Sequence, residues 1–287
     1  GRRPELEQVK ALLLDPAQRL VTLTGTGGTG KTRLSIQAAS EIASHFPDGV
    51  WFAPLAALQS TDGLVPAVAK ALDFSFYKEE ERPRQQLLDY LWEKELLLIL
   101  DNFEHLVGNG AVSLVSDILQ TAKRVKLLVT SRVRLNVQGE QLYQVKGMRT
   151  PEPAAAAAWE RPEEALQAYS GLNLFIDRAR RVQPAFRLDG NNLAYAADIC
   201  QLVEGLPLGI ELAAAWLELL TPGEIAAEIR RSLDFLESPK RRPVPPHGAR
   251  AAGAAALSPG ALYRHRFYES NLHGSAVDHA GARAHDQ

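Results

Sequence analysis

The sequence predicts an α/β fold in which a parallel β-sheet is flanked by helices and followed by a small all-α subdomain. Between residues 19 and 145, short β-rich runs alternate with helical patterns, as expected of repeated strand–helix–strand units. One run, residues 96–100, is apolar at every position, which indicates a central strand covered on both faces. From residue 163 to 236 the apolar residues recur only with helical spacing.

Five runs are predicted to form the strands of the sheet. They are residues 20–24, 50–53, 96–100, 125–130 and 141–145. The first four are followed by polar, glycine or proline residues that mark loops. Helical patterns lie between them, at residues 32–44, 84–93 and 111–122. Residues 1–146 are therefore expected to form one doubly wound sheet domain.

A segment rich in proline and alanine follows the sheet. Residues 147–162 contain three prolines and five consecutive alanines, a composition typical of an interdomain linker. Residues 163–237 are then expected to form the all-α subdomain. Its helices are predicted around residues 174–179 and at 192–204, 207–220 and 222–236. Thr221 before Pro222 is a typical helix start.

The segment 238–287 breaks this pattern. Helical periodicity stops after Leu236, and five of the seven histidines fall here among Arg, Ala, Pro and Gly residues. These histidines have no regular ligand spacing, so the composition favours an irregular, disordered or non-native tail over a metal site. One hypothesis is translation in a shifted reading frame, which an intact frame on resequencing would contradict. The start at Gly1, without Met, suggests a fragment of a longer chain.

Composition and charge exclude several classes of protein. Hydrophobic residues make up 46% and charged residues 23% of the chain, and the net charge is −2. These values predict a globular protein without general attraction to nucleic acid or anionic membranes. No apolar run approaches the ~20 residues that cross a bilayer. The single cysteine, Cys200, excludes an internal disulfide and fits a reducing, cytoplasmic compartment.

A glycine-rich loop joins the first predicted strand to the first predicted helix. Residues 25–32 read GTGGTGKT, which satisfies G-x-x-x-x-G-K-[ST] in the strand–loop–helix context that this motif requires. Glycines let backbone N–H groups approach phosphate oxygens, and the helix start adds a positive dipole end. Lys31 supplies a charge to the β- and γ-phosphates, and the Thr32 hydroxyl ligates Mg²⁺. The residues expected to hold ATP here are Gly25, Thr26, Gly27, Gly28, Thr29, Gly30, Lys31 and Thr32.

Two other interpretations fit this loop less well. A plain glycine-rich turn has the same composition, but it explains neither the lysine nor the threonine. A dinucleotide-binding loop gives Lys31 and Thr32 no role. The phosphate loop is therefore the preferred interpretation.

The buried run at residues 96–100 ends in Asp-Asn-Phe-Glu-His. Asp101 lies where an open α/β sheet places its ligands, and it is expected to hold Mg²⁺ opposite Thr32. The alternative is that Asp101 only caps the following segment. Asn102 stands where many hydrolytic relatives of such loops have a second carboxylate, so Glu104 is the candidate catalytic base. Glu104 could equally be a solvated acid.

The fourth predicted strand runs into Thr130-Ser131-Arg132. Arg132 could reach the γ-phosphate and report whether it is present, in a catalytic or sensing role. The alternative is a surface arginine that pairs locally. Beside the phosphate loop and Asp101, sensing is the preferred interpretation.

Four motifs stand in one order: GTGGTGKT, LLLILDNFEHL, LLVTSR and GLPLGIELAA. This set resembles the STAND class of signal-transduction ATPases, close to the NB-ARC type, over residues 1–236. More narrowly, it looks like bacterial transcriptional regulators in which the ATPase accompanies a LuxR-type helix-turn-helix, a SARP domain or helical repeats.

The resemblance implies further roles. Pro207 matches a proline that contacts bound nucleotide, Arg132 matches the sensor arginine, and residues 1–6 match an opening motif near the adenine. Such proteins hold ADP at rest and exchange it for ATP to open or self-associate, and they bind DNA only through a domain absent from this chain. The sequence departs from the family pattern at two points. Asn102 replaces the second acid of many relatives, which implies slow hydrolysis, and the expected winged-helix continuation fails near Ser238.

Two alternatives to a signalling switch remain. A metabolic phosphotransferase could use the same loop, but it needs an arginine-rich lid that residues 172–236 do not clearly offer. A nucleotide-binding module without significant hydrolysis agrees with Asn102. The effector, the output domain and the target genes lie outside what these residues encode.

Overall fold

The computed structural model describes residues 1–77, 82–108, 110–151, 162–187 and 190–237. The alanine-rich part of the predicted linker and the predicted irregular tail at 238–287 lie outside these residues. Residues Gly1–Arg241 group into one compact unit. Within the described residues, no helix is long and apolar enough to cross a membrane.

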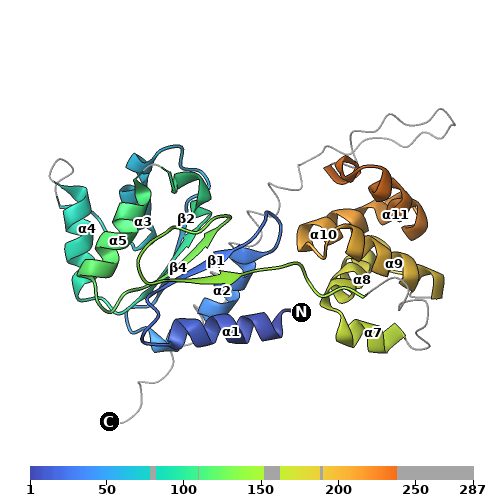
Figure 1. Ribbon diagram of the computed structural model, residues 1–287, viewed down its shortest axis with the longest axis horizontal. Coiled ribbons are helices and arrows are strands. Elements are labelled where there is room, and N and C mark those ends of the chain that lie inside the picture. The colour runs from blue at the N-terminus through green and yellow to red at the C-terminus, as the bar shows by residue number, and fades with distance from the viewer. Residues whose placement is uncertain (78–81, 109, 152–161, 188–189, 238–287) are drawn as a thin grey trace, which may run out of the picture. The chain divides into compact units, whose positions relative to one another are not determined.

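A five-stranded parallel sheet organises the first half of the chain, with strand order β2-β3-β4-β1-β5 (Figure 1). The strands are β1 (Leu20–Thr24), β2 (Val50–Pro54), β3 (Leu97–Asp101), β4 (Lys126–Ser131) and β5 (Glu140–Gln144). All five predicted strands are present, each within one residue of the predicted start. β3 is buried at every position, as its unbroken apolar run predicts. The α/β class predicted from the sequence is confirmed.

Helices cover both faces of this sheet (Figure 1). On one face, α3 (Leu64–Ala71), α4 (Pro83–Trp92) and α5 (Ala111–Thr121) pack on Leu98, Leu100, Leu127 and Val129 of the central strands. On the other face, α1 (Arg3–Leu14) and α2 (Lys31–Glu41) pack on Val21, Leu23, Ile99 and Leu128. Neighbouring strand residues point to opposite faces, so an apolar run in β3 serves two cores.

Among the described residues, 162–187 and 190–237 are mainly helical and have a core of their own. Its helices are α7 (Pro162–Ala168), α8 (Ser170–Val182), α9 (Gly190–Leu202), α10 (Pro207–Ala215) and α11 (Pro222–Arg231). Phe175, Cys200 and Ile225 are among the residues fully buried between them. Thr221 starts α11 with a reciprocal capping box: its hydroxyl accepts from the Glu224 N–H, and the Glu224 carboxylate accepts from the Thr221 N–H.

Some predicted element ends were wrong. The predicted helices 207–220 and 222–236 stop at Ala215 and Arg231, and short 3₁₀ turns, Trp216–Glu218 and Leu233–Glu237, follow them. Apolar periodicity continues through such turns, so it cannot locate the change in hydrogen bonding. The sequence analysis also assigned no element to α1 or α3. Pro66 lies in the first turn of α3, where proline is tolerated.

Candidate functional site

The carboxyl ends of β3, β4 and β1 lie side by side, because these strands are neighbours in the parallel sheet. Each end carries a predicted site residue or leads directly to one: Asp101 ends β3, Arg132 follows β4, and the glycine-rich loop follows β1. Residues separated by up to 107 positions in the sequence therefore meet at one edge. This is the edge at which open α/β sheets bind their ligands.

The glycine-rich loop has the backbone that its motif predicts. Gly28 and Gly30 have φ of +78° and +85°, in the left-handed region that glycine adopts without strain. Gly30 is the N-cap of α2, so it has no side chain to cover the first N–H groups of that helix. Thr29 is buried, and its hydroxyl donates to the Thr26 carbonyl at 2.9 Å. The loop thus presents uncapped backbone donors and a dipole end suited to phosphate.

Lys31 lies across the loop. Its Nζ donates to the carbonyl oxygens of Gly25 and Thr26, at 2.8 and 3.0 Å. Partial burial lowers the pKa of Lys31, and Arg132 lowers it further, while Glu104 and Asp101 raise it. An anionic partner stabilises the charged form of a partly desolvated ammonium group that is held by two carbonyls.

Asp101 joins the loop helix to the sheet. Its Oδ1 accepts hydrogen bonds from the Thr32 hydroxyl at 2.7 Å and from the Thr130 hydroxyl at 2.6 Å. Burial raises the pKa of Asp101, and the two hydroxyl donors act against that rise. Thr32 and Asp101, the two predicted Mg²⁺ ligands, are therefore adjacent.

The donor set fits magnesium. A hydroxyl and a carboxylate are hard oxygen ligands, and Mg²⁺ typically takes one or two protein oxygens together with phosphates and water. Within the described part of the chain, no group of three or more His, Cys, Asp or Glu side chains could hold a metal by itself.

Glu104 and Arg132 form an ion pair, with Arg132 Nε and Glu104 Oε1 3.2 Å apart. The Arg132 side chain is 64% exposed, whereas that of Glu104 is 18% exposed. Glu104 Oε2 is buried and has no hydrogen-bond partner among the residues that the structure describes. Arg132 also reaches the loop, since a Cβ added at Gly27 would lie 3.2 Å from its Nη2. The two candidate catalytic residues contact each other beside the loop.

The residues Pro207 and Leu208 contact the loop from the helical part of the chain. The Leu208 N–H lies 3.3 Å from the Gly28 carbonyl that accepts its hydrogen bond. A Cβ added at Gly30 would lie 3.8 Å from Pro207 Cγ, and one added at Gly28 would lie 3.0 Å from Leu208 Cβ. The sequence analysis singled out Pro207 only through the resemblance and did not single out Leu208.

Thr130, like Leu208, is a residue at this site to which the sequence analysis gave no role. It is 1% exposed, it donates to Asp101, and its oxygen accepts from the Asn102 N–H at 2.9 Å. The available signal was a hydroxyl residue at the polar end of an apolar strand, two positions before Arg132. That signal identifies Asp101 as the partner of Thr130 only when the strand order is known.

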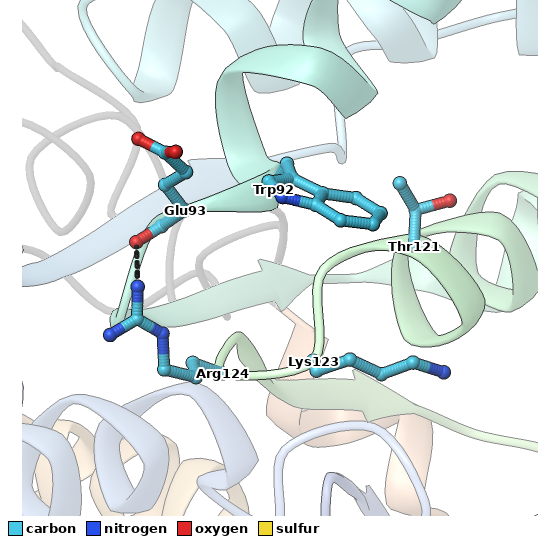
Figure 2. Close-up of a pocket in the computed structure, with 5 residues that line it drawn as sticks. All are labelled: Trp92, Glu93, Thr121, Lys123 and Arg124. Atoms are coloured by element: carbon cyan, nitrogen blue, oxygen red, sulfur yellow. Dashed lines mark hydrogen bonds between the residues drawn. The ribbon is translucent and has the colours of Figure 1, made fainter.

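A separate hollow of about 570 Å³ lies away from these residues (Figure 2). It is lined by Trp92, Glu93, Thr121, Lys123 and Arg124, with Arg124 donating to the Glu93 carbonyl at 2.6 Å. These residues lie at or just after the ends of α4 and α5, before β3 and β4 begin, so they lie at the amino edge of the sheet. The hollow is therefore distinct from the candidate site at the carboxyl edge.

Comparison with known protein families gives one match that covers more than half of the chain. The NB-ARC domain family matches residues 2–152, which include the loop, Asp101 and Arg132. The chain belongs to the NB-ARC domain family. The resemblance drawn from the four motifs is confirmed, and the chain is a nucleotide-binding module of the P-loop class.

Two curated relatives of this NB-ARC chain are much longer proteins. A protein of Mycobacterium tuberculosis, whose name describes an HTH-type transcriptional regulator, is 35% identical over 222 residues. That alignment covers 76% of this chain and 22% of the relative. Regulatory protein AfsR of Streptomyces griseus is 27% identical over 235 residues, covering 75% of this chain and 21% of AfsR. The chain thus spans about a fifth of the length of these relatives.

Solved structures also resemble the NB-ARC chain at low sequence identity. A Signal Transduction ATPase with Numerous Domains from Pyrococcus horikoshii, with a tetratricopeptide repeat sensor, is 18% identical. The match covers 80% of this chain and 32% of that chain, with a TM-score of 0.48.

Proposed function

We propose that this NB-ARC chain binds ATP and ADP with Mg²⁺ at residues 25–32 and acts as a nucleotide-dependent switch within a longer regulatory protein. The observation that carries the proposal is the 2.7 Å hydrogen bond between Thr32, at the start of α2, and Asp101, at the end of β3. This bond brings the two predicted cation ligands together directly beside the phosphate loop.

Each part of the site has a role in this proposal. The uncapped N–H groups of the loop and of α2 would bind the β-phosphate, and Lys31 would exchange its two carbonyl partners for phosphate oxygens. Thr32 and Asp101 would hold Mg²⁺, which neutralises charge on the β- and γ-phosphates when it is bound. These assignments rest on contacts between the motif residues and on the known chemistry of such loops.

The pair of Arg132 and Glu104 supplies a means of distinguishing ATP from ADP. An ion pair with one largely exposed partner contributes about 1 kcal/mol or less, so a phosphate group can displace it. A γ-phosphate would attract Arg132, which already reaches Gly27. Glu104, whose Oε2 has no hydrogen-bond partner among the described residues, would then be free to accept a proton from water.

The contact of Leu208 and Pro207 with the loop connects nucleotide state to the helices. A change of loop conformation at Gly28 alters the surface on which Leu208 packs. The γ-phosphate would then bias a two-state arrangement of the helical part, with self-association as one outcome. Regulation of transcription, through DNA contacts made by another domain, is supported by the names of the longer relatives. A cytoplasmic location belongs to the same proposal.

A second candidate is a module that binds nucleotide without significant hydrolysis. Asn102 favours it, because an amide cannot take a proton at the position that follows Asp101. Single-turnover measurement with radiolabelled ATP separates the two candidates: a rate that falls in Glu104→Gln supports slow hydrolysis, and an undetectable rate in the unmodified chain supports binding alone.

The central test is nucleotide affinity, measured by titration with a fluorescent ADP analogue in Mg²⁺. Lys31→Ala removes a charged donor to phosphate, which contributes about 1.5–3 kcal/mol, so affinity should fall roughly 10- to 150-fold. Lys123→Ala, an exposed lysine at the opposite edge of the sheet, is the matched control and should bind as the unmodified chain does. Equal affinity of both variants would overturn the proposal.

A further inference from the structure

The side chain of Thr130 holds two neighbouring residues of the cation site at once. Its hydroxyl donates to Asp101 Oδ1 at 2.6 Å and accepts from the Asn102 N–H at 2.9 Å. The residue is 1% exposed and lies in β4, which pairs with β3 on one side and β1 on the other. A hydroxyl group is needed for both bonds, because it is at once a donor and an acceptor.

The bond to Asp101 bears on the orientation of its carboxylate. Asp101 Oδ1 accepts from Thr32 as well as from Thr130. Thr32 lies at the exposed start of α2, whereas Thr130 is fixed inside the sheet. The partner that stays in place when ligands arrive is therefore Thr130. Partners of this kind orient a metal-binding carboxylate without touching the metal.

The bond to Asn102 fixes the turn that leaves β3. Asn102 has φ of +68°, a left-handed conformation that asparagine tolerates better than most residues. Its N–H bond to Thr130 holds the chain at the point where it turns toward Glu104. Thr130 thus connects the strand before Arg132 to both Asp101 and the segment that carries Glu104.

We infer that Thr130 is a positioning residue for the magnesium–nucleotide site, which orients the Asp101 carboxylate and the Asn102 turn and thereby sets how strongly Mg²⁺ promotes nucleotide binding. This inference rests on the proposed function. Thr130 acts through Asp101 and touches neither phosphate nor metal. Its effect is therefore expected in the dependence of binding on Mg²⁺ and not in binding without the metal.

Thr130→Val keeps the shape of the side chain and removes both hydrogen bonds, and Thr130→Ser keeps the hydroxyl. Thr22→Val is the matched control: Thr22 is a fully buried threonine on the adjacent strand β1, and its hydroxyl has no hydrogen-bond partner among the described residues. All three substitutions change a buried β-branched position in the centre of the same sheet.

The experiment titrates each variant with a fluorescent ADP analogue, first in EDTA and then at increasing Mg²⁺. In Thr130→Val, the affinity in EDTA should stay within about twofold of the unmodified chain. The Mg²⁺ concentration for half-maximal enhancement should rise roughly 10- to 100-fold, the usual effect of removing an outer partner of a metal ligand. Thr130→Ser should restore the unmodified dependence, and Thr22→Val should not alter it.

Two results would overturn the inference. One is an unchanged Mg²⁺ dependence in Thr130→Val while the unmodified chain binds nucleotide. The other is loss of the fold in both Thr130→Val and Thr130→Ala, by circular dichroism, at temperatures at which Thr22→Val is folded, since that would show a structural role. Absence of nucleotide binding in the unmodified chain would instead contradict the proposed function itself.

Discussion

Gly205 is a position at which a single methyl group is expected to disturb the helical part of the chain strongly. It lies just after α9 with φ of +66°, and its N–H donates to the Cys200 carbonyl at 2.8 Å, as in a left-handed helix C-cap. Its carbonyl accepts from the Met148 N–H at 2.7 Å. A Cβ here would lie 2.2 Å from the Met148 carbonyl oxygen, so Gly205→Ala cannot be accommodated without a backbone shift.

The expected cost follows from two terms. An L-residue in the left-handed region costs about 1–2 kcal/mol. Relieving the overlap requires separating residues 148 and 205, which loses a backbone hydrogen bond of about 1 kcal/mol. Together these predict a loss of about 2–3 kcal/mol. At a denaturant slope of roughly 2 kcal/mol per molar, the urea midpoint should fall by about 1–1.5 M.

Cys200 provides the assay for this loss. It is the only cysteine in the chain, it is fully buried in the helical core, and it bonds to Gly205 through its carbonyl. Its reaction with a coloured thiol reagent, followed across a urea series, therefore reports opening of the helices around α9.

Substitutions at two other glycines allow the conformational cost to be measured separately from the cost of the overlap with Met148. Gly139 has φ of +79°, and no described residue lies within 4 Å of an added Cβ, so Gly139→Ala should show only the conformational cost. Gly108 has no positive φ, and no described residue lies within 4 Å of an added Cβ, so Gly108→Ala should be neutral within about 0.5 kcal/mol. A loss in Gly205→Ala no larger than that in Gly139→Ala would refute the reasoning about Met148.

Three further predictions concern α11, the buried thiol and the candidate base. Thr221→Ala should lower stability by about 0.5–2 kcal/mol in thermal or urea unfolding and Thr221→Ser by much less, because only the hydroxyl caps the Glu224 N–H; equal losses would contradict this. Burial raises the pKa of the Cys200 thiol, so above pH of about 8.5 the unfolded chain ionises while the folded chain does not. Stability should then fall by up to about 1.4 kcal/mol per pH unit, and a slope that persists in Cys200→Ala would argue against this cause. Glu104→Gln should slow single-turnover ATP cleavage roughly 100-fold or more while ADP affinity stays within a few-fold, and an unchanged rate would remove Glu104 as the base.

The sequence by itself determined the features that depend on residues close together in the chain. Residues 25–32 and their flanking strand and helix were recognisable because one short segment carries the glycines, the lysine and the threonine that phosphate binding requires. The unbroken apolar run of β3 predicted burial on both faces, and Thr221 with Pro222 predicted the start of α11. In each case the deciding hydrogen bonds or periodicity are local.

Only the tertiary structure decided which of these segments meet. The order β2-β3-β4-β1-β5 places Thr130 beside Asp101 and Asn102, and Arg132 beside Glu104 and Gly27. The contact of Gly205 with Met148 is likewise visible only in the tertiary structure, because no local sequence pattern indicates it. The physical reason is that a strand's own residues specify that it is buried, whereas its neighbours are selected by the packing of the whole sheet. The chemistry of this site depends on those neighbours.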